Sequence, residues 1–250
     1  MSAAEYFRKS AELLEKIEAT QGDAIRDAAQ LMASSIAGDN WVYLFGSGHS
    51  VIPVLDVYPR YGSYVGYKPI MDPRLMWFNV IGPGGAPELL WLERQEGYIA
   101  NFLKTYSITD KDSMVVYSHG GLNAAPIEAA QYARAKGCKV IAVTSMDNHR
   151  KAEARHSSGM KLADAADVVI DNSVPLEDSL VDVGQIEKVG AGSTLAVIVI
   201  SMALVAETAR VLKERGVHLT TFVSPNVEGV SPDHNLKVFE QYQLKTRRRS

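Results

Sequence analysis

Two apolar runs in this chain end abruptly in loops of glycine, serine and histidine, and a helical pattern follows each loop. Trp41 to Phe45 ends at Gly46-Ser47-Gly48-His49-Ser50, and Met114 to Tyr117 ends at Ser118-His119-Gly120-Gly121-Leu122-Asn123. Short continuous apolar runs bounded by such loops are typical of strands buried on both faces of a parallel sheet. The order of strand, loop and helix therefore predicts an α/β fold.

The same alternation continues along the chain. Further strands are predicted at 139–143 and 167–170, and helices at about 86–106, 124–136 and 193–213. Strands that alternate with helices at this spacing form parallel sheets with right-handed crossovers. No internal repeat or linker interrupts the pattern, so we expect one domain over residues 1–250. Its parts are N-terminal helices (1–38), an α/β core (39–215) and a C-terminal extension (216–250).

The first forty residues have the apolar spacing of amphipathic helices. Gly22-Asp23 combines a helix-ending residue with a helix-capping one, which predicts two helices with a break between them. Helices that precede the first strand need a surface to cover. A neighbouring subunit or the flank of the sheet would supply it, and the same argument applies to the long apolar helix from Ser193. We therefore expect a homodimer or homotetramer.

Charge and composition exclude several classes of protein. The net charge of −3 argues against a general nucleic-acid binder, which needs a basic face. The longest apolar run, 195–206, is shorter than the ~20 residues of a membrane span. No signal-peptide pattern is present, so we expect a cytoplasmic protein without a membrane partner. The basic run 245–249 is expected to be a solvated tail, and Cys138 a buried structural thiol.

The two loops are the best candidates for a ligand site. Ligands of open parallel sheets bind beyond the carboxyl ends of the strands, a rule that also selects residues 144–149. The loops offer unblocked backbone N–H groups and hydroxyls at predicted helix starts, which suits a phosphate. Neither loop has the third glycine of a dinucleotide fingerprint or the Gly-Lys-Ser/Thr of a Walker A loop. A tight turn is the alternative for either loop, but two such loops favour an anion site.

Carboxylates and histidines near the loops are the acid–base candidates. They are Glu96, Glu128, His49, His119 and His156. No pair of these residues has the spacing of metal ligands, so we expect no metal and no cofactor.

At this point the sequence resembles the SIS (sugar isomerase) domain family. The two loops look like its signature loops, and further similar stretches narrow the resemblance to a bacterial subfamily of phosphosugar-binding or phosphosugar-isomerase proteins. These stretches are 96–98, 155–159, 166–172, 192–194 and 224–229. The resemblance covers nearly the whole chain. It implies a three-layer αβα sandwich around a mostly five-stranded parallel sheet, here preceded by an N-terminal helical hairpin, and oligomers whose sites form between subunits.

The resemblance also implies binding residues, because family members hold the phosphate with hydroxyls and backbone amides of the second loop. Ser118 matches the first serine of that loop, while Gly120 and Asn123 replace the hydroxyls expected next. The bound head group is therefore a phosphate or a related anion such as a sulfonate. The expected substrate-binding residues are Gly46, Ser47, Gly48, His49, Ser50, Ser118, His119, Gly120, Gly121, Asn123, Ser193 and Thr194.

The implied activity is cofactor-free aldose–ketose isomerisation of a sugar phosphate, within carbohydrate metabolism. Glu96 is the first choice for the carboxylate that moves the proton and His156 the second, with an exposed helix glutamate as the alternative for Glu96. Two other functions stay open. One is a lyase or etherase acting on an N-acetyl sugar phosphate, and the other is a phosphosugar sensor without catalysis.

Overall fold

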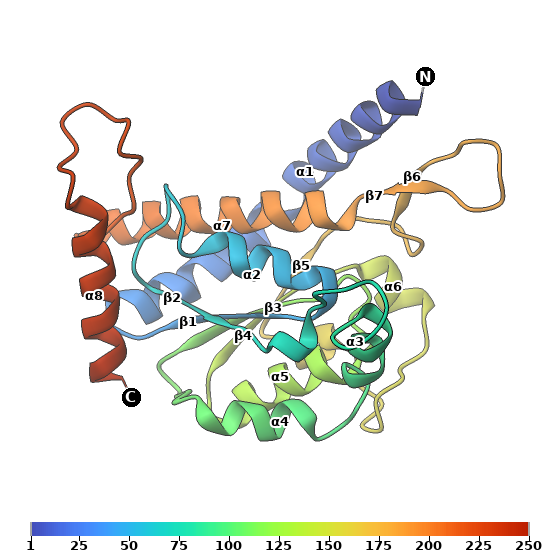
Figure 1. The fold of residues 1–250 in the computed structure, drawn as a ribbon, viewed down its shortest axis with the longest axis horizontal. Helices are drawn as coiled ribbons and strands as arrows, with labels where there is room; N and C mark the ends of the chain where they lie inside the picture. Colours follow the sequence, from blue (N-terminus) through green and yellow to red (C-terminus); the bar gives the residue numbers. More distant parts are fainter. Residues whose placement is uncertain (1, 250) are drawn as a thin grey trace.

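Five parallel strands form the central sheet of the computed structural model, which describes residues 2–249 (Figure 1). Their spatial order is β2-β1-β3-β4-β5. The strands are β1 (Val42–Gly46), β2 (Tyr67–Ile70), β3 (Ser113–Tyr117), β4 (Lys139–Thr144) and β5 (Val168–Asp171). Four of them coincide with predicted strands to within one residue at each end. The fifth, β2, was not predicted, because Pro69 interrupts its pattern, and it lies at the sheet edge where proline is tolerated.

Alternate residues of the central strands face opposite layers of helices. Val42 and Leu44 of β1 pack on the face covered by helices α1 (Ser2–Ala37), α2 (Val51–Val57) and α7 (Ser193–Glu214). Tyr43 and Phe45 pack on the other face, which α3 (Ala86–Leu92), α4 (Tyr98–Phe102) and α5 (Ala124–Ala135) cover. Figure 1 shows the two helical layers on either side of the sheet. The predicted three-layer sandwich is thus confirmed, and both faces of the sheet are buried as the apolar runs required.

The helices are best given in chain order. They are α1 (Ser2–Ala37), α2 (Val51–Val57), α3 (Ala86–Leu92), α4 (Tyr98–Phe102), α5 (Ala124–Ala135), α6 (Met146–Lys151), α7 (Ser193–Glu214) and α8 (His234–Arg248). Short 3-10 turns lie at 48–50, 73–75, 103–105 and 162–165.

The prediction of an N-terminal helical hairpin is wrong, because residues 2–37 form one continuous helix of 36 residues. Glycine in a helix interior costs only about 1 kcal/mol, so Gly22 alone does not break a helix. Burial of Ala28, Met32 and Ala33 stabilises α1, and α1 packs along α7. The N-terminal end of α1 projects beyond the sheet (Figure 1).

The helix expected at 86–106 is divided. Helix α3 ends at Leu92, and the chain turns through Gly97, whose φ of 83° is in the left-handed region that favours glycine. Helix α4 begins after this turn, at Tyr98. Residues on either side of the turn therefore point to different surroundings, which decides the geometry of the candidate site.

An antiparallel hairpin lies between β5 and α7, where no strand was predicted. It consists of β6 (Ser179–Val181) and β7 (Val189–Ala191) and leads directly into α7. The hydroxyl of Tyr6 in α1 donates to the carbonyl of Ala191 at 2.7 Å. The hairpin is therefore fixed to the projecting part of α1.

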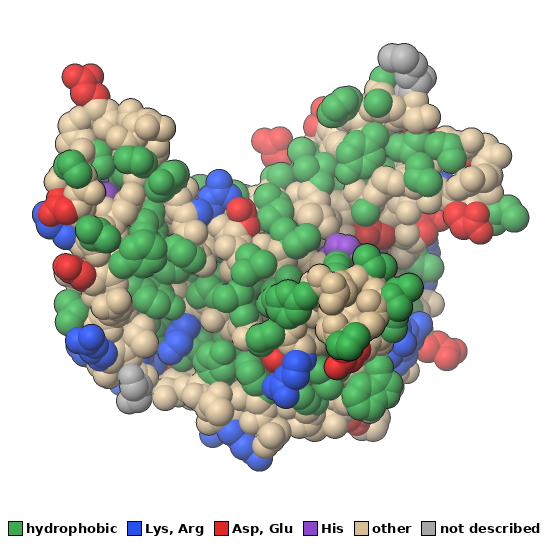
Figure 2. Space-filling view, in the orientation of Figure 1, with side chains coloured by type: hydrophobic (Ala, Val, Ile, Leu, Met, Phe, Trp, Pro, Cys, Tyr) green, Lys and Arg blue, Asp and Glu red, His purple; other side chains and the backbone are tan. Residues whose placement is uncertain are grey.

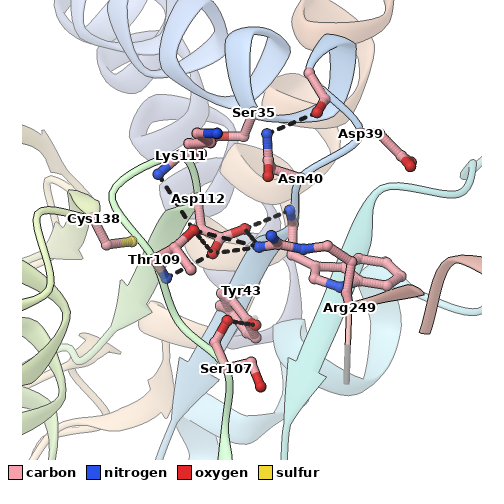
Figure 3. A network of polar contacts seen from close by, with 12 residues as sticks. Ser35, Asp39, Asn40, Tyr43, Ser107, Thr109, Lys111, Asp112, Cys138 and Arg249 are labelled. Atoms are coloured by element: carbon pink, nitrogen blue, oxygen red, sulfur yellow. Dashed lines mark hydrogen bonds and ion pairs between the residues drawn. The ribbon is translucent and has the colours of Figure 1, made fainter. Parts of the chain in front are cut away.

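The basic run at 245–249 is not a solvated tail. Lys245 of α8 is buried and donates to the carbonyl of Asn40 at 2.7 Å, with its ammonium over the Trp41 ring. Arg249 donates to both carboxylate oxygens of buried Asp112 at 2.7 and 2.8 Å (Figure 3). Helix α8 is thus held against the amino ends of the strands by Lys245 and Arg249, two cations that were expected to be exposed to solvent.

Helix α7 and Cys138 have structural roles. By length and composition α7 could cross a bilayer, but half of its most apolar stretch is buried inside the protein, as in a core helix. Cys138 is buried and free, and burial raises the pKa of its thiol, as expected of a structural cysteine.

Candidate functional site

The first loop turns sharply because its glycine has no side chain. A Cβ on Gly46 would lie 2.0 Å from the carbonyl oxygen of Ser50, so the turn requires glycine. Gly48 follows with a φ of 60°. The turn directs the Ser47 hydroxyl toward Glu93, to which it donates at 2.7 Å.

The second loop brings the start of α5 to the same sheet edge. The Ser118 hydroxyl accepts the N–H of Gly121 at 3.1 Å, and a Cβ on Gly121 would lie 2.7 Å from the Thr144 hydroxyl. Asn123 is the N-cap of α5, but its side chain does not cap the helix. Its amide donates instead to Glu93 at 2.7 Å. Both loops therefore meet at one carboxyl group.

A cleft of about 290 Å³ lies between the two loops, beyond the carboxyl ends of β1 and β3. Most of the expected binding residues line it: Ser47, Gly48, His49, Ser50, Ser118, His119, Gly120, Asn123 and Ser193. Three do not: Gly46 and Gly121, whose missing side chains shape the turns, and Thr194, which lies inside α7. The other lining residues are Trp77, Ala86, Leu89, Leu90, Glu93 and Asp178.

Glu93 is the residue on which the cleft converges. Its side chain is buried, one carboxylate oxygen accepts from Ser47 and the other from Asn123. Burial raises the pKa of Glu93, and the hydrogen bond from Ser47 and the charge of Arg94 offset this only in part. Among residues 2–249, no lysine or arginine lines the cleft itself. Glu93 thus combines a position in the wall of the cleft with a carboxyl group whose pKa is raised.

His119 is held as a neutral ring between two asparagines. Its Nδ1 lies 3.2 Å from the amide nitrogen of Asn172, whose oxygen accepts from Val174 and is therefore fixed. Nδ1 must then be an acceptor, which places the proton of the neutral ring on Nε2. Nε2 lies 3.2 Å from the side-chain amide of Asn148, which accepts this proton only when its oxygen is turned toward the ring. Burial lowers the pKa of His119, in agreement with this neutral form.

Asp178 occupies the start of α7. Its carboxylate accepts the N–H of Ser193 at 2.7 Å, the N–H of Gly192 at 3.1 Å and the Ser193 hydroxyl at 2.8 Å. The donors that a helix start offers to an anion are therefore already used here. With Glu93 and Asp178 both present, the cleft carries two carboxyl groups and no arginine or lysine.

Glu96 and His156 do not line this cleft. They line a neighbouring pocket of about 210 Å³, which shares Asn123 with the cleft. Glu96 accepts the N–H and the hydroxyl of Ser157, and the pKa of its carboxyl is lowered, chiefly by that hydroxyl. The cause of this placement is the turn at Gly97, because the helix that was expected to carry Glu96 ends at Leu92.

Glu93, Asp178 and Trp77 were missed as site residues. One signal in the sequence pointed to Glu93, since it follows buried Leu89 by four positions and so lies on the buried face of α3. Trp77 packs edge-on against the ring of His49, with centroids 4.6 Å apart. Neither Trp77 nor Asp178 has a comparable signal, because each reaches the cleft through an irregular segment.

Comparison with known proteins agrees with this fold. The family model described as SIS domain matches residues 5–145. A UPF0309 protein of Halalkalibacterium halodurans is 35% identical over 231 residues, which cover 92% of this chain and 93% of the relative. A UPF0309 protein of Thermoanaerobacter pseudethanolicus is 33% identical over 249 residues, covering 97% of this chain and 98% of the relative.

Solved structures show the same fold at low sequence identity. The phosphoheptose isomerase of Neisseria gonorrhoeae aligns with a TM-score of 0.56 at 18% identity, covering 83% of this chain and 97% of that one. A phosphoheptose isomerase of Francisella tularensis aligns with a TM-score of 0.55 at 15% identity, covering 83% of this chain and 96% of that one. The domain match and the full-length relatives lead to one conclusion: the chain belongs to the SIS domain family and, within it, to the UPF0309 proteins.

Proposed function

We propose that this protein is a cofactor-free aldose–ketose isomerase that acts on a phosphorylated sugar, with Glu93 as the base. The observation that carries the proposal is the buried carboxyl of Glu93 between the two loops, with its raised pKa. A general base works best when its pKa lies near the working pH. The SIS fold and its similarity to phosphoheptose isomerases support the substrate class.

In the proposed reaction Glu93 takes the proton from the carbon beside the carbonyl of the open-chain sugar. It then returns a proton to the former carbonyl carbon, either the same one or one that the carboxyl group has exchanged with solvent, so no atom is gained or lost. The backbone N–H groups of His119 and Gly120 would donate to the enediolate oxygen, since those of Ser118 and Gly121 are bonded within the protein. His49 lines the same cleft, and its ring has no hydrogen-bond partner among residues 2–249. We assign to it the transfer of a hydroxyl proton between the two oxygens.

This assignment replaces Glu96 by Glu93. Glu96 was chosen because it precedes a glycine on an expected helix, but in the structure it faces Ser157 in the neighbouring pocket. Its lowered pKa also makes it a weaker base than Glu93, whose pKa is raised.

A panel of sugar phosphates tests the proposal in two steps. Ligands are first found by the rise in melting temperature, because a ligand that binds the folded state stabilises it. Isomerisation of each ligand in D₂O is then followed by NMR. We expect deuterium at the carbon beside the carbonyl, and Glu93→Gln should lower turnover by about 10²–10⁴-fold while ligand binding persists.

Glu153→Gln is the matched control, because Glu153 is exposed and lines neither the cleft nor the pocket. It should leave turnover unchanged. Equal turnover in Glu93→Gln and the wild type would remove Glu93 from the mechanism. A sugar phosphate that binds without any solvent exchange would favour a sensor.

We also propose that the protein is a homo-oligomer. Hydrophobic side chains gather in the hollow between α8 and the projecting end of α1 (Figure 2). Outside this hollow, Phe7 of α1 is 73% exposed, and Val80 and Ile81 beside the cleft are 75% and 81% exposed. Exposed apolar patches of this kind mark association surfaces. Light scattering should give a mass at least twice the 27.3 kDa of one chain at micromolar concentration, and a monomer mass would contradict the proposal.

A further inference from the structure

The proposed base lies at the very end of a helix, so helix geometry alone does not set its position. Helix α3 ends at Leu92, and Glu93 is its C-terminal cap. The chain then turns through residues 94–97, and Gly97 completes the turn with its left-handed φ of 83°. The direction of the Glu93 carboxyl therefore depends on the contacts that hold the segment 93–97 in place.

Helix α5 holds this segment at both of its ends. The N–H of Ala125 donates to the carbonyl of Glu93 at 2.9 Å. The carboxylate of Glu128 accepts the N–H of Gly97 at 2.5 Å. Ala125 and Glu128 are three positions apart, and residues at this spacing are neighbours on one side of a helix. One side of α5 thus presents a donor and an acceptor that match the two ends of the segment.

The carboxyl group of Glu128 is buried without a bonded cation. Glu128 is 8% exposed, and its Oε2 has no hydrogen-bond partner among residues 2–249. Nε2 of His156 lies 3.7 Å from Oε1 of Glu128 and 3.8 Å from Oε2 of Glu96, and both distances are too long for a hydrogen bond. Nδ1 of the same ring accepts the N–H of Ser158, so the ring is neutral with its proton on Nε2.

Stability does not account for a carboxyl group in this position. A buried carboxylate without a counter-charge costs more free energy than one hydrogen bond to a neutral N–H returns. Gly97 is exposed, so water can replace the carboxylate at its N–H. An apolar side chain of similar volume at position 128 would avoid the cost of burial. The bond between Glu128 and Gly97 therefore has a role other than stabilisation of the fold.

Glu128 does not contact a bound substrate directly. It lines neither the cleft nor the neighbouring pocket. Its bonded partner, Gly97, belongs to the segment that begins with Glu93. The carboxyl of Glu93 meets Ser47 and Asn123 at 2.7 Å each, and such bonds weaken steeply when their geometry changes. A displacement of the turn at Gly97 would therefore change the position of the base.

We propose that Glu128 is a positioning residue, whose carboxylate holds the N–H of Gly97 and so keeps Glu93 between the two loops. The inference rests on the proposed function for the role of Glu93 as base. The hold on the Glu93 carboxyl does not depend on the reaction. An oxygen acceptor at position 128 is what this role requires, and not a negative charge, because the bonded donor is a neutral N–H.

Two substitutions separate the acceptor from the charge. Glu128→Gln keeps an oxygen at the same place in the side chain, whereas Glu128→Leu removes it. Ionisation of Glu93 is followed by NMR of carboxyl-labelled glutamate, and its signal is identified by its absence in Glu93→Gln. In the wild type, burial raises the pKa of Glu93. In Glu128→Leu the released carboxyl should be hydrated and its pKa should fall toward about 4.3, while Glu128→Gln should keep the wild-type pKa.

Gln131→Leu is the matched control. Gln131 lies three positions further along α5, and its amide contacts Ser158 and Met160 rather than the segment 93–97. The substitution removes a polar side chain from the same helix, so the pKa of Glu93 should not change. Glu128→Leu should melt at the wild-type temperature or above it, because it removes a buried carboxylate without a counter-charge.

With an identified substrate, the kinetic constants give a second measurement. Misplacement of a catalytic group by about 1 Å lowers a rate by on the order of 10²-fold. Glu128→Leu should therefore lower kcat by about 10–100-fold with little change in KM, because the loops that bind the substrate keep their contacts. Glu128→Gln should retain most of the wild-type turnover.

The outcomes separate the inference from the proposed function. A wild-type pKa of Glu93 in Glu128→Leu, or an equal fall of this pKa in Glu128→Gln, would overturn the positioning role. Loss of the folded state in both Glu128→Leu and Glu128→Met would also overturn it, since Glu128 would then be a structural residue. A fall of the pKa in Glu128→Leu alone supports the role even where no sugar phosphate is isomerised. Unchanged turnover in Glu93→Gln would contradict only the proposed function.

Discussion

Glu93 and Asp112 are buried carboxyl groups at opposite ends of the sheet, and their hydrogen-bond partners differ. At the carboxyl end, Glu93 accepts from a hydroxyl and a side-chain amide and has no cation bonded to it. At the amino end, Asp112 accepts two backbone N–H groups, one hydroxyl and the Arg249 guanidinium (Figure 3). The difference lies in the bonded counter-charge. Arg249 fixes Asp112 in the fold, whereas Glu93 has no bonded cation among residues 2–249 and has the raised pKa that the proposed base requires.

The sharpest test of this contrast is Asp112→Asn. The substitution keeps the shape but leaves the partly buried Arg249 without its counter-charge and turns an amide toward N–H donors. Removing one partner of a buried ion pair is strongly destabilising, so the free energy of unfolding should fall by about 3 kcal/mol. Urea denaturation measures it. Asp110→Asn, an exposed neighbour, is the control; equal effects of the two would mean that Asp112 is not a structural clamp.

A second test uses Lys245, the other buried group of the amino end. Burial lowers the pKa of Lys245 to about 8, below the ordinary value of a lysine. A lysine with a lowered pKa contributes stability above its unfolded pKa and loses that contribution as pH falls through the folded value. From pH 8 to pH 10 the wild type should therefore gain about 2 kcal/mol relative to Lys245→Met. Chemical denaturation at both pH values checks this.

The exposed Lys213→Met serves as the control for that experiment, and it should follow the wild type across the same range. Parallel curves for the wild type and Lys245→Met would show that Lys245 remains charged without cost. Of the two buried charged groups at the amino end of the sheet, only Asp112 would then affect the stability of the fold.

The smallest effect concerns the stability of Glu93→Gln. Because the pKa of Glu93 is raised in the folded protein, its contribution to stability is complete below the unfolded pKa of about 4.3 and is lost as pH rises through the folded value. Glutamine does not titrate, so the variant should be as stable as the wild type or about 1 kcal/mol more stable at pH 8. This advantage should shrink at pH 4. Destabilisation of Glu93→Gln at pH 8 would place Glu93 with the structural carboxylates.

Most of the sheet could be predicted from the sequence because its central strands are buried on both faces. Both faces of these strands are apolar, so they are stable only where helices cover the sheet on both sides. This holds for the runs Trp41 to Phe45 and Met114 to Tyr117. Elements stabilised by tertiary contacts were missed or misassigned. The β6–β7 hairpin is fixed to Tyr6, and α8 is anchored by Lys245 and Arg249, so no local pattern marks either.

The loops of the site were predictable for a different reason: their glycines are required by contacts within the turn itself. The base was not. Glu96 and Glu93 are three positions apart, and only the ending of α3 at Leu92 separates their surroundings. The position of a helix end is among the least certain features of a sequence pattern, which is why the choice between the two glutamates needed the structure.

The ion pair between Asp112 and Arg249 also bears on the order in which parts of the chain fold during synthesis. The two residues are 137 positions apart, so at the usual rates of synthesis Arg249 follows Asp112 by on the order of ten seconds. During that interval every strand of the central sheet has been made, while Asp112 has only its neutral donors. A nascent chain can thus assemble the sheet and both loops of the site before its amino-end edge is closed. Helix α8 and Arg249 are made after every strand of the central sheet, and they cover a surface that was formed earlier.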